Sequence, residues 1–255
     1  MGKIIAIALN TFRESIRDRI FYSLLFFAVV LILFSMVLGN LTIGDPLKII
    51  KDFGLGSISI VGTLIAIFVG IGMVYKEMEK KTIFLILSKP LARWQFLIGK
   101  YCGLSLTILV EVVVMSLFLF ILCYLYSRDI PWALLYAIVP IYFEILLILA
   151  IAFFFSTFST SFLSGMFTLS IFIIGHLTRD LKNIAETTED ALLQGLSNAM
   201  YYVLPNLEFL NFKTRVVHHL SITPAEVILS IAYSFFYTMA VLLIAIFIFQ
   251  RRDIS

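Results

Sequence analysis

Two glutamates stand within long apolar stretches of this 255-residue chain. Glu111 lies inside the stretch 101–126, and Glu144 lies inside 132–155. A charged side chain at the centre of a lipid bilayer costs about 2.5–3.5 kcal/mol on insertion scales, so each carboxyl should face protein or water. Two roles are open for the pair: a place in a translocation path or between two subunits, or neutral carboxyls bonded to neighbouring Ser, Thr or Tyr hydroxyls.

The spacing of the two glutamates predicts that they lie at the same depth. A turn at Arg128-Asp129 separates the two stretches; Glu111 precedes Arg128 by 17 residues and Glu144 follows it by 16. In an antiparallel helical hairpin this puts both carboxyls at nearly one level, somewhat to the cytoplasmic side of the midplane. Pro140 removes a backbone donor one turn before Glu144 and predicts a kink there.

Other motifs of catalysis and metal binding do not match this sequence. No Gly-x-x-x-x-Gly-Lys-Ser/Thr loop is present, so the chain has no phosphate-binding loop of its own for ATP. The histidines His176, His218 and His219 are expected at or beyond the external face of the membrane. Because adjacent histidines do not share a helix face, and no Cys or Met cluster accompanies them, we predict no metal site.

Composition indicates that these residues belong to a membrane protein. Hydrophobic residues make up 61% of the chain and charged residues 14%, a balance that excludes a water-soluble domain of this length. A helix that crosses a bilayer needs about 20 mostly apolar residues. Six segments qualify, of which the fifth is the shortest: about 20–40, 55–75, 101–126, 132–155, 160–177 and 227–249. The predicted fold is an all-α membrane protein, one transmembrane domain over 1–255 with six transmembrane helices.

Basic residues predict the orientation of these helices. With the N-terminus in the cytoplasm, 12 of the 19 Lys and Arg residues fall on the cytoplasmic side. Four of the remaining seven lie in the long segment 178–226, where charge has less influence on topology. Six helices with both termini in the cytoplasm satisfy this distribution.

An amphipathic stretch, residues 3–19, leads directly into the first span. Its apolar residues Ile5, Leu9, Phe12 and Ile16 recur on one helical face, and polar residues occupy the opposite face. A helix with this pattern lies in the membrane interface, so we predict an N-terminal elbow helix. Its residues of interest are Phe12, Arg13, Glu14, Arg17, Asp18 and Arg19.

The loop 76–100 is predicted to be the main cytoplasmic feature. Lys76-Glu77-Met78-Glu79-Lys80-Lys81 pairs acids with bases three and four residues apart, which favours a short helix before Pro90. A second amphipathic turn follows over 91–98. An ordinary basic loop would account for the charges, but the apolar run Ile83-Phe84-Leu85-Ile86-Leu87 must be buried in lipid, in the bundle or in a partner.

The external segment 178–226 is too long for a plain connector. Thr188 is predicted to cap a helix that ends near Pro205, because apolar residues recur at helical spacing between them. Thr223-Pro224-Ala225-Glu226 is a second start signal, with a hydroxyl cap, Pro at the first helical position and Glu three residues after the cap. It marks the beginning of the sixth span.

Three stretches together resemble a known family. They are Ala8 through Arg19, the loop from Glu77 through Leu87-Ser88-Lys89-Pro90 and Arg93 to Gly99-Lys100, and Tyr202-Val203-Leu204-Pro205-Asn206-Leu207. They resemble the elbow, the coupling region and the external segment of the ABC-2 type permease family. The nearest branch is the one associated with multicopper-enzyme maturation, which includes the nitrous-oxide reductase maturation permease. The likeness extends over most of the chain.

The resemblance implies a homodimer of six-helix subunits, each bound on its cytoplasmic side to an ATPase subunit that holds ATP and Mg. This chain would be a permease with no ATPase site and no cofactor of its own, working as an exporter in the bacterial cytoplasmic (inner) membrane, with lipid but no nucleic acid as a partner. A coupling helix between spans 2 and 3 would dock on the ATPase. The residues implied in that contact are Glu77, Met78, Glu79, Lys80, Lys81, Thr82, Phe84 and Leu87.

Two other functions remain open beside this one. An ATP-independent secondary transporter or channel would use Glu111 and Glu144 as ion or proton sites, although the six spans show no internal repeat. A membrane assembly factor would bind partners without any conformational change driven by an ATPase. The sequence does not identify the transported substrate.

Overall fold

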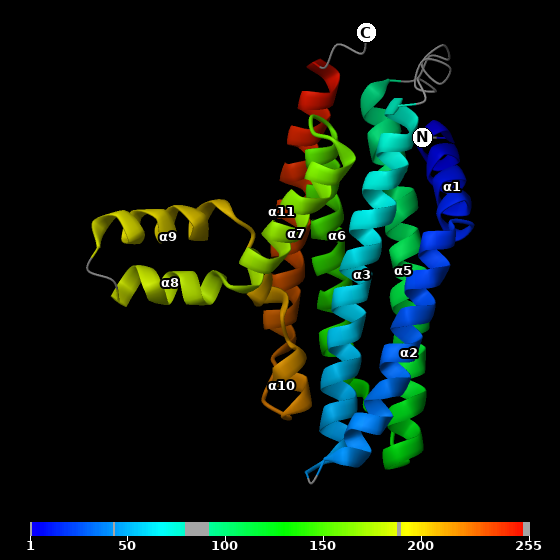
Figure 1. The fold of residues 1–255 in the computed structure, drawn as a ribbon, viewed down its shortest axis with the longest axis vertical. Helices are drawn as coiled ribbons and strands as arrows, with labels where there is room; N and C mark the ends of the chain where they lie inside the picture. Colours follow the sequence, from blue (N-terminus) through cyan, green and yellow to red (C-terminus); the bar gives the residue numbers. More distant parts are fainter. Residues whose placement is uncertain (1, 43, 80–91, 188–189, 252–255) are drawn as a thin grey trace.

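The computed structural model describes residues 2–42, 44–79, 92–187 and 190–251, and over these ranges the chain is helical with no strands (Figure 1). Five helices are long and apolar enough to cross a membrane. They are α2 (Arg19–Leu41), α3 (Pro46–Glu79), α5 (Arg93–Ser127), α6 (Leu135–Ser156, preceded by the 3-10 turn η1, Trp132–Leu134) and α11 (Pro224–Arg251). The prediction of an all-α membrane protein is confirmed.

The fifth predicted span is the exception in length. Helix α7 (Ser161–His176) has 16 residues, about 24 Å of helix against the roughly 30 Å of a hydrocarbon layer. It is a sixth apolar helix, long enough to cover only part of the bilayer. The remaining depth is filled by residues 207–217, which pack into the bundle after α9.

Helix starts follow the capping signals of the sequence. Helix α11 begins at Pro224 with a reciprocal cap: the backbone N–H of Thr223 donates to Glu226 Oε2 at 3.0 Å, and the backbone N–H of Glu226 donates to Thr223 Oγ1 at 3.4 Å. Helix α2 begins after Asp18, whose carboxylate accepts from the Ile20 backbone N–H at 2.9 Å.

Helices α3 and α6 form the centre of the bundle. Helix α3 packs against α2, α5 and α6, and its glycines make close approach possible. A Cβ on Gly62 would lie 2.5 Å from Ile145 Cδ1, and one on Gly70 would lie 2.8 Å from Leu149 Cδ1, both on α6. Helices in a bilayer associate mainly by such close packing, because lipid is as apolar as the side chains.

The N-terminal helix α1 (Gly2–Ile16) packs beside the N-terminal end of α5 (Figure 1). Its contact face is made of the small residues Ala8, Thr11 and Ser15, which are buried. The apolar face that the sequence identified instead looks outward, with Ile5 and Leu9 exposed. An outward apolar face suits a helix at a membrane surface, and the sequence pattern alone did not reveal the second, small-residue face.

The segment before the last span is more elaborate than predicted. It forms α8 (Thr178–Thr187), α9 (Ala191–Val203), the 3-10 turn η2 (Leu207–Leu210) and the short helix α10 (Lys213–Val217). The predicted cap of α9 was wrong: Asp190 is the N-cap, because its carboxylate stands two residues before the Leu192 backbone N–H and accepts from it at 2.9 Å. Thr188 lies outside the described residues.

Helices α8 and α9 pair with each other and extend sideways from the bundle (Figure 1). The chain then returns, and η2 and α10 pack against α3, α6, α7 and α11. The return segment contributes buried side chains to the core: Leu207, Leu210, Phe212, Val216 and Val217. It therefore occupies the bundle beyond the C-terminal end of the short helix α7.

Candidate functional site

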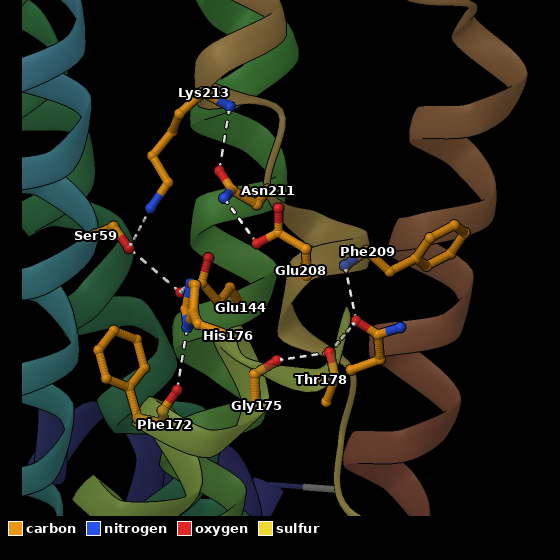
Figure 2. A network of polar contacts seen from close by, with 11 residues as sticks. Ser59, Glu144, Phe172, Gly175, His176, Thr178, Glu208, Phe209, Asn211 and Lys213 are labelled. Carbon is orange, nitrogen blue, oxygen red and sulfur yellow. Dashed lines mark hydrogen bonds and ion pairs between the residues drawn. The ribbon is translucent and has the colours of Figure 1, made fainter. Parts of the chain in front are cut away.

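Glu144 is the centre of a buried polar cluster built by four elements (Figure 2). Its side chain on α6 is fully buried, and Ser59 Oγ of α3 donates to Glu144 Oε1 at 3.2 Å. His176 Nε2, at the end of α7, lies 3.4 Å from the same oxygen. Lys213 Nζ of α10 donates to Ser59 Oγ at 3.1 Å. We refer to Ser59, Glu144, His176 and Lys213 as the Glu144 cluster.

The position of His176 allows a hydrogen bond between its imidazole and the Glu144 carboxyl. His176 Nδ1 lies 3.1 Å from the carbonyl oxygen of Phe172, which can only accept, so Nδ1 carries a hydrogen. His176 Nε2 then faces Glu144 Oε1, and a hydrogen bond between them needs a proton on one of these two atoms. Either imidazolium with carboxylate or imidazole with carboxylic acid would supply that proton.

Two members of this cluster were placed incorrectly by sequence reasoning. His176 was expected at or beyond the external face. Lys213 is one of the four basic residues of the segment 178–226, which was predicted to be external. Both side chains reach the level of Glu144. The cause is the short helix α7, which ends beside the middle of α6, and the return segment, which brings Lys213 back into the bundle. One signal was present: Lys213 lies between the apolar residues Phe212 and Val216. His218 and His219 are exposed after α10 and do not join the cluster.

Glu111 is buried in a different environment. It has no exposed surface, and neither carboxyl oxygen has a hydrogen-bond partner among the described residues. It faces α3 at Gly62, where an added Cβ would lie 3.6 Å from Glu111 Oε1. Ser59, the partner of Glu144, is one turn away on the same helix. The carboxyl of Glu111 on α5 and that of Glu144 on α6 thus face neighbouring turns of α3. This agrees with the equal depth deduced from their spacing.

A second set of hydrogen bonds fixes the root of the α8–α9 pair. Thr178 Oγ1 donates to Asn206 Oδ1 at 2.9 Å, and that same oxygen accepts from the Phe209 backbone N–H at 3.2 Å (Figure 2). The backbone N–H of Asn206 donates to the Tyr233 hydroxyl of α11 at 2.9 Å. These bonds tie the start of α8, the return segment and α11 together.

Two grooves open along the exposed face of α3. A groove of about 490 Å³ between α3 and α7 is lined almost wholly by apolar side chains such as Leu64, Phe68 and Met166. A polar groove of about 430 Å³ lies among α2, α3 and α10. Asp52, Asn211 and Lys213 are on its walls, so it borders the Glu144 cluster.

The N-terminal end of α5 is bonded to two other helices, α11 and α1. Arg93 Nη1 donates to the carbonyl oxygens of Phe249 at 3.4 Å and Gln250 at 3.1 Å, at the end of α11. Lys100, which is 2% exposed, pairs with Glu14 of α1 at 3.6 Å. Ser15 of α1 also donates to the sulfur of Met73 on α3 at 3.3 Å.

The other predicted site residues are only partly described. Among the elbow residues, Asp18 caps α2, Phe12 is half-buried, and Arg13, Arg17 and Arg19 are exposed. The predicted coupling residues Glu77, Met78 and Glu79 belong to the last turn of α3, which ends there. The rest lie outside the described residues: Lys80, Lys81, Thr82, Phe84 and Leu87.

Comparison with known families decides what kind of membrane protein carries these features. A family model described as ABC-2 family transporter protein matches residues 5–254. This chain belongs to the ABC-2 transporter family. The match does not test the narrower resemblance to the multicopper-enzyme maturation branch. That branch therefore stays a prediction. A search of curated proteins found no match.

Family membership makes this chain a multi-pass membrane permease subunit. ABC-2 permeases are generally the non-catalytic transmembrane subunits of their transporters, and they typically work with an ABC ATPase subunit. The five long apolar helices of this ABC-2 permease are the membrane-crossing part that such a subunit requires.

Proposed function

We propose that this permease is the membrane-spanning subunit of an ATP-driven exporter in the bacterial cytoplasmic membrane. A separate ATPase subunit binds ATP and Mg and docks on the cytoplasmic loop, with Glu77 through Leu87 in the contact. Two copies of the chain form the transmembrane unit, with both termini of each in the cytoplasm. Family membership supports the partnership with an ATPase.

One observation carries the coupling part of this proposal. The first three turns of α5, which follow directly on the loop, are bonded to α11 through Arg93 and to α1 through Lys100. Close backbone contact adds to this, because a Cβ on Gly103 would lie 2.5 Å from the Ala8 carbonyl oxygen. A force applied to the loop by an ATPase would therefore reach α1, α5 and α11 together rather than a single span.

The test is co-purification in mild detergent with mass spectrometry of the bound proteins. The tagged chain is expected to bring down an ATPase subunit, and Glu77→Lys/Glu79→Lys should abolish the association. The matched control is Asp45→Lys/Asp129→Lys, an equal charge change in the external turns, which should leave it intact. An ATPase retained equally by both variants would contradict the coupling site, and no ATPase at all would contradict the proposed function.

ATP-independent transport has one specific observation in its favour, the contact of 3.4 Å between the titratable side chains of Glu144 and His176 at mid-bundle. If the purified chain moves a solute under an ion gradient without an ATPase, this second function replaces the first. Glu111→Gln and Glu144→Gln should then each stop transport. A chain that binds partners without either activity would fit an assembly factor.

A further inference from the structure

The α8–α9 pair, residues 178–203, leaves the bundle at an unusual depth. We call this pair the arm. One root is fixed by His176, which contacts Glu144, nine residues or about 14 Å from the external end of α6. The other root is fixed by the Tyr237 hydroxyl, which donates to the Val203 carbonyl oxygen at 3.0 Å. Tyr237 lies 13 residues, about 20 Å, from the start of α11. Both roots therefore lie near the middle of the helices that cross the bilayer.

The chemistry of the arm does not suit lipid at that depth. Helix α8 exposes the charged side chains of Asp180, Lys182 and Glu186, and Lys182 pairs with Glu186 at 4.0 Å while both remain more than half exposed. Charged side chains at the centre of a bilayer are strongly disfavoured unless they face protein or water. Helix α8 therefore needs a polar environment inside the membrane.

Water alone does not suit the arm either. Helix α9 exposes large apolar side chains, with Leu192 77%, Tyr202 81% and Val203 71% exposed. The arm packs mainly on itself, with Lys182 Nζ 5.7 Å above the Tyr201 ring, and it points away from its own bundle (Figure 1). The arm thus projects at mid-membrane with one polar face and one apolar face. Both faces can be buried together only by another protein surface that has polar and apolar parts at the same depth.

The surface of this chain has that character. Its polar groove, with Asp52 and Lys213, reaches the level of Ser59 and hence of Glu144. The apolar groove continues from it along α3 through Leu64 and Phe68. A second copy of the chain presents both grooves within the membrane, at the depth where the arm emerges. Opposite charges are available on the two sides, since Lys182 and Glu186 can meet Asp52 and Lys213.

We propose that the arm lies across a second copy of this chain, with α8 at the polar groove of that copy and the apolar face of α9 against its apolar surface. The inference rests on the proposed homodimer and adds to it the segment that joins the two copies. In a symmetric pair each arm makes the same contact on the other copy.

Photo-cross-linking in membranes tests this contact. Tyr202 is replaced by the photoreactive analogue benzoylphenylalanine in the full-length chain, and a copy with a different tag is expressed beside it. Irradiation should give an adduct of two 29.0 kDa chains that carries both tags, with the linked peptide in α3 or α7 of the second copy, the helices that line the apolar groove. The matched control is the same replacement at Phe26, an exposed aromatic residue of α2 that is 72% exposed and should react with lipid.

The copy number of the detergent-purified complex, measured by light scattering, separates the two proposals. Two copies without a Tyr202 adduct, or with equal adducts from Tyr202 and Phe26, would contradict the arm contact and leave the homodimer standing. A single copy would contradict both. An adduct to a different protein would also overturn the proposal.

Discussion

At the scale of single residues, the buried carboxyls differ in how well they are satisfied. Glu144 Oε1 has a hydroxyl donor and an imidazole beside it, whereas Glu144 Oε2 and both oxygens of Glu111 have no hydrogen-bond partner within the described chain. Buried polar groups are usually paired, and an unpaired one lowers stability. This contrast indicates that Glu144 supports the fold. The burial of Glu111 lowers the stability of the fold, and no contact in the described chain offsets that loss.

Substitutions at Glu144 should separate hydrogen bonding from charge. In Glu144→Gln the amide oxygen can take the position of Oε1 and still accept from Ser59 Oγ, so the free energy of unfolding should change little. In Glu144→Leu both partners lose their bond, and unfolding should become easier by about 1–2 kcal/mol. Thermal unfolding of the detergent-solubilised chain measures the difference. Equal loss in both variants would mean that the carboxylate charge, through Lys213, holds the cluster together.

The same Gln variants test for function as distinct from stability. A role of either carboxyl in transport predicts that Glu111→Gln or Glu144→Gln lowers the transport rate while the chain stays folded. If both variants transport normally, the two glutamates are structural. This is the interpretation in which they are neutral carboxyls bonded to neighbouring hydroxyls.

At the scale of elements, the contact between α1 and α5 depends on the absence of side chains. Gly99 and Gly103 allow the backbone of α1 to approach, and a Cβ on Gly103 would lie 2.6 Å from the Thr11 Cβ. The neighbouring atom on the other side is a backbone carbonyl, which cannot move aside as the end of a flexible side chain can. The elbow is therefore fixed to α5 by steric fit, with Glu14 and Lys100 adding a charge contact.

Gly103→Ala should weaken this contact. The added methyl forces the helices apart, and overpacking of this kind typically costs about 1–3 kcal/mol. The control is Gly72→Ala on α3, where no atom lies within 4 Å of the added Cβ and the helix should be unchanged or slightly more stable. Protease cleavage of α1 in the purified protein reports the loosening. Equal protection of α1 in both variants would show that the elbow is held by other contacts.

At the scale of the whole molecule, topology is the property that the proposed function most needs. The N-terminus, the C-terminus and the loop between α3 and α5 must all face the ATPase. In the structure the N-terminus and the end of α11 lie toward the same end of the bundle (Figure 1). The turn at Arg128 and Asp129 lies at the opposite end of α5.

Cysteine labelling in intact cells tests this arrangement. The background is Cys102→Ser/Cys123→Ser, which removes the native thiols. A membrane-impermeant maleimide should label Asp129→Cys from outside, and it should label Lys3→Cys and Arg251→Cys only after the cells are permeabilised. The reverse pattern would place the termini outside and contradict docking of a cytoplasmic ATPase.

The sequence by itself determined the class of the protein and the course of its long helices. Continuous apolar segments of bilayer length, basic loops and local capping signals are properties of neighbouring residues, so five long spans, the Thr223–Glu226 cap and the common depth of Glu111 and Glu144 could be deduced from them. The sequence also showed that the fifth apolar segment, 160–177, is the shortest of the six.

Only the tertiary structure decided which distant residues meet. The inward turn of Lys213, the position of His176 beside Glu144 and the small-residue face of α1 depend on contacts between segments far apart in the chain, and hydrophobic periodicity carries no information on such partners. The arm is the clearest case. Its helices were partly predictable, but its depth follows from the early end of α7 and the return of η2 and α10, because together these fill one span's place in the bundle.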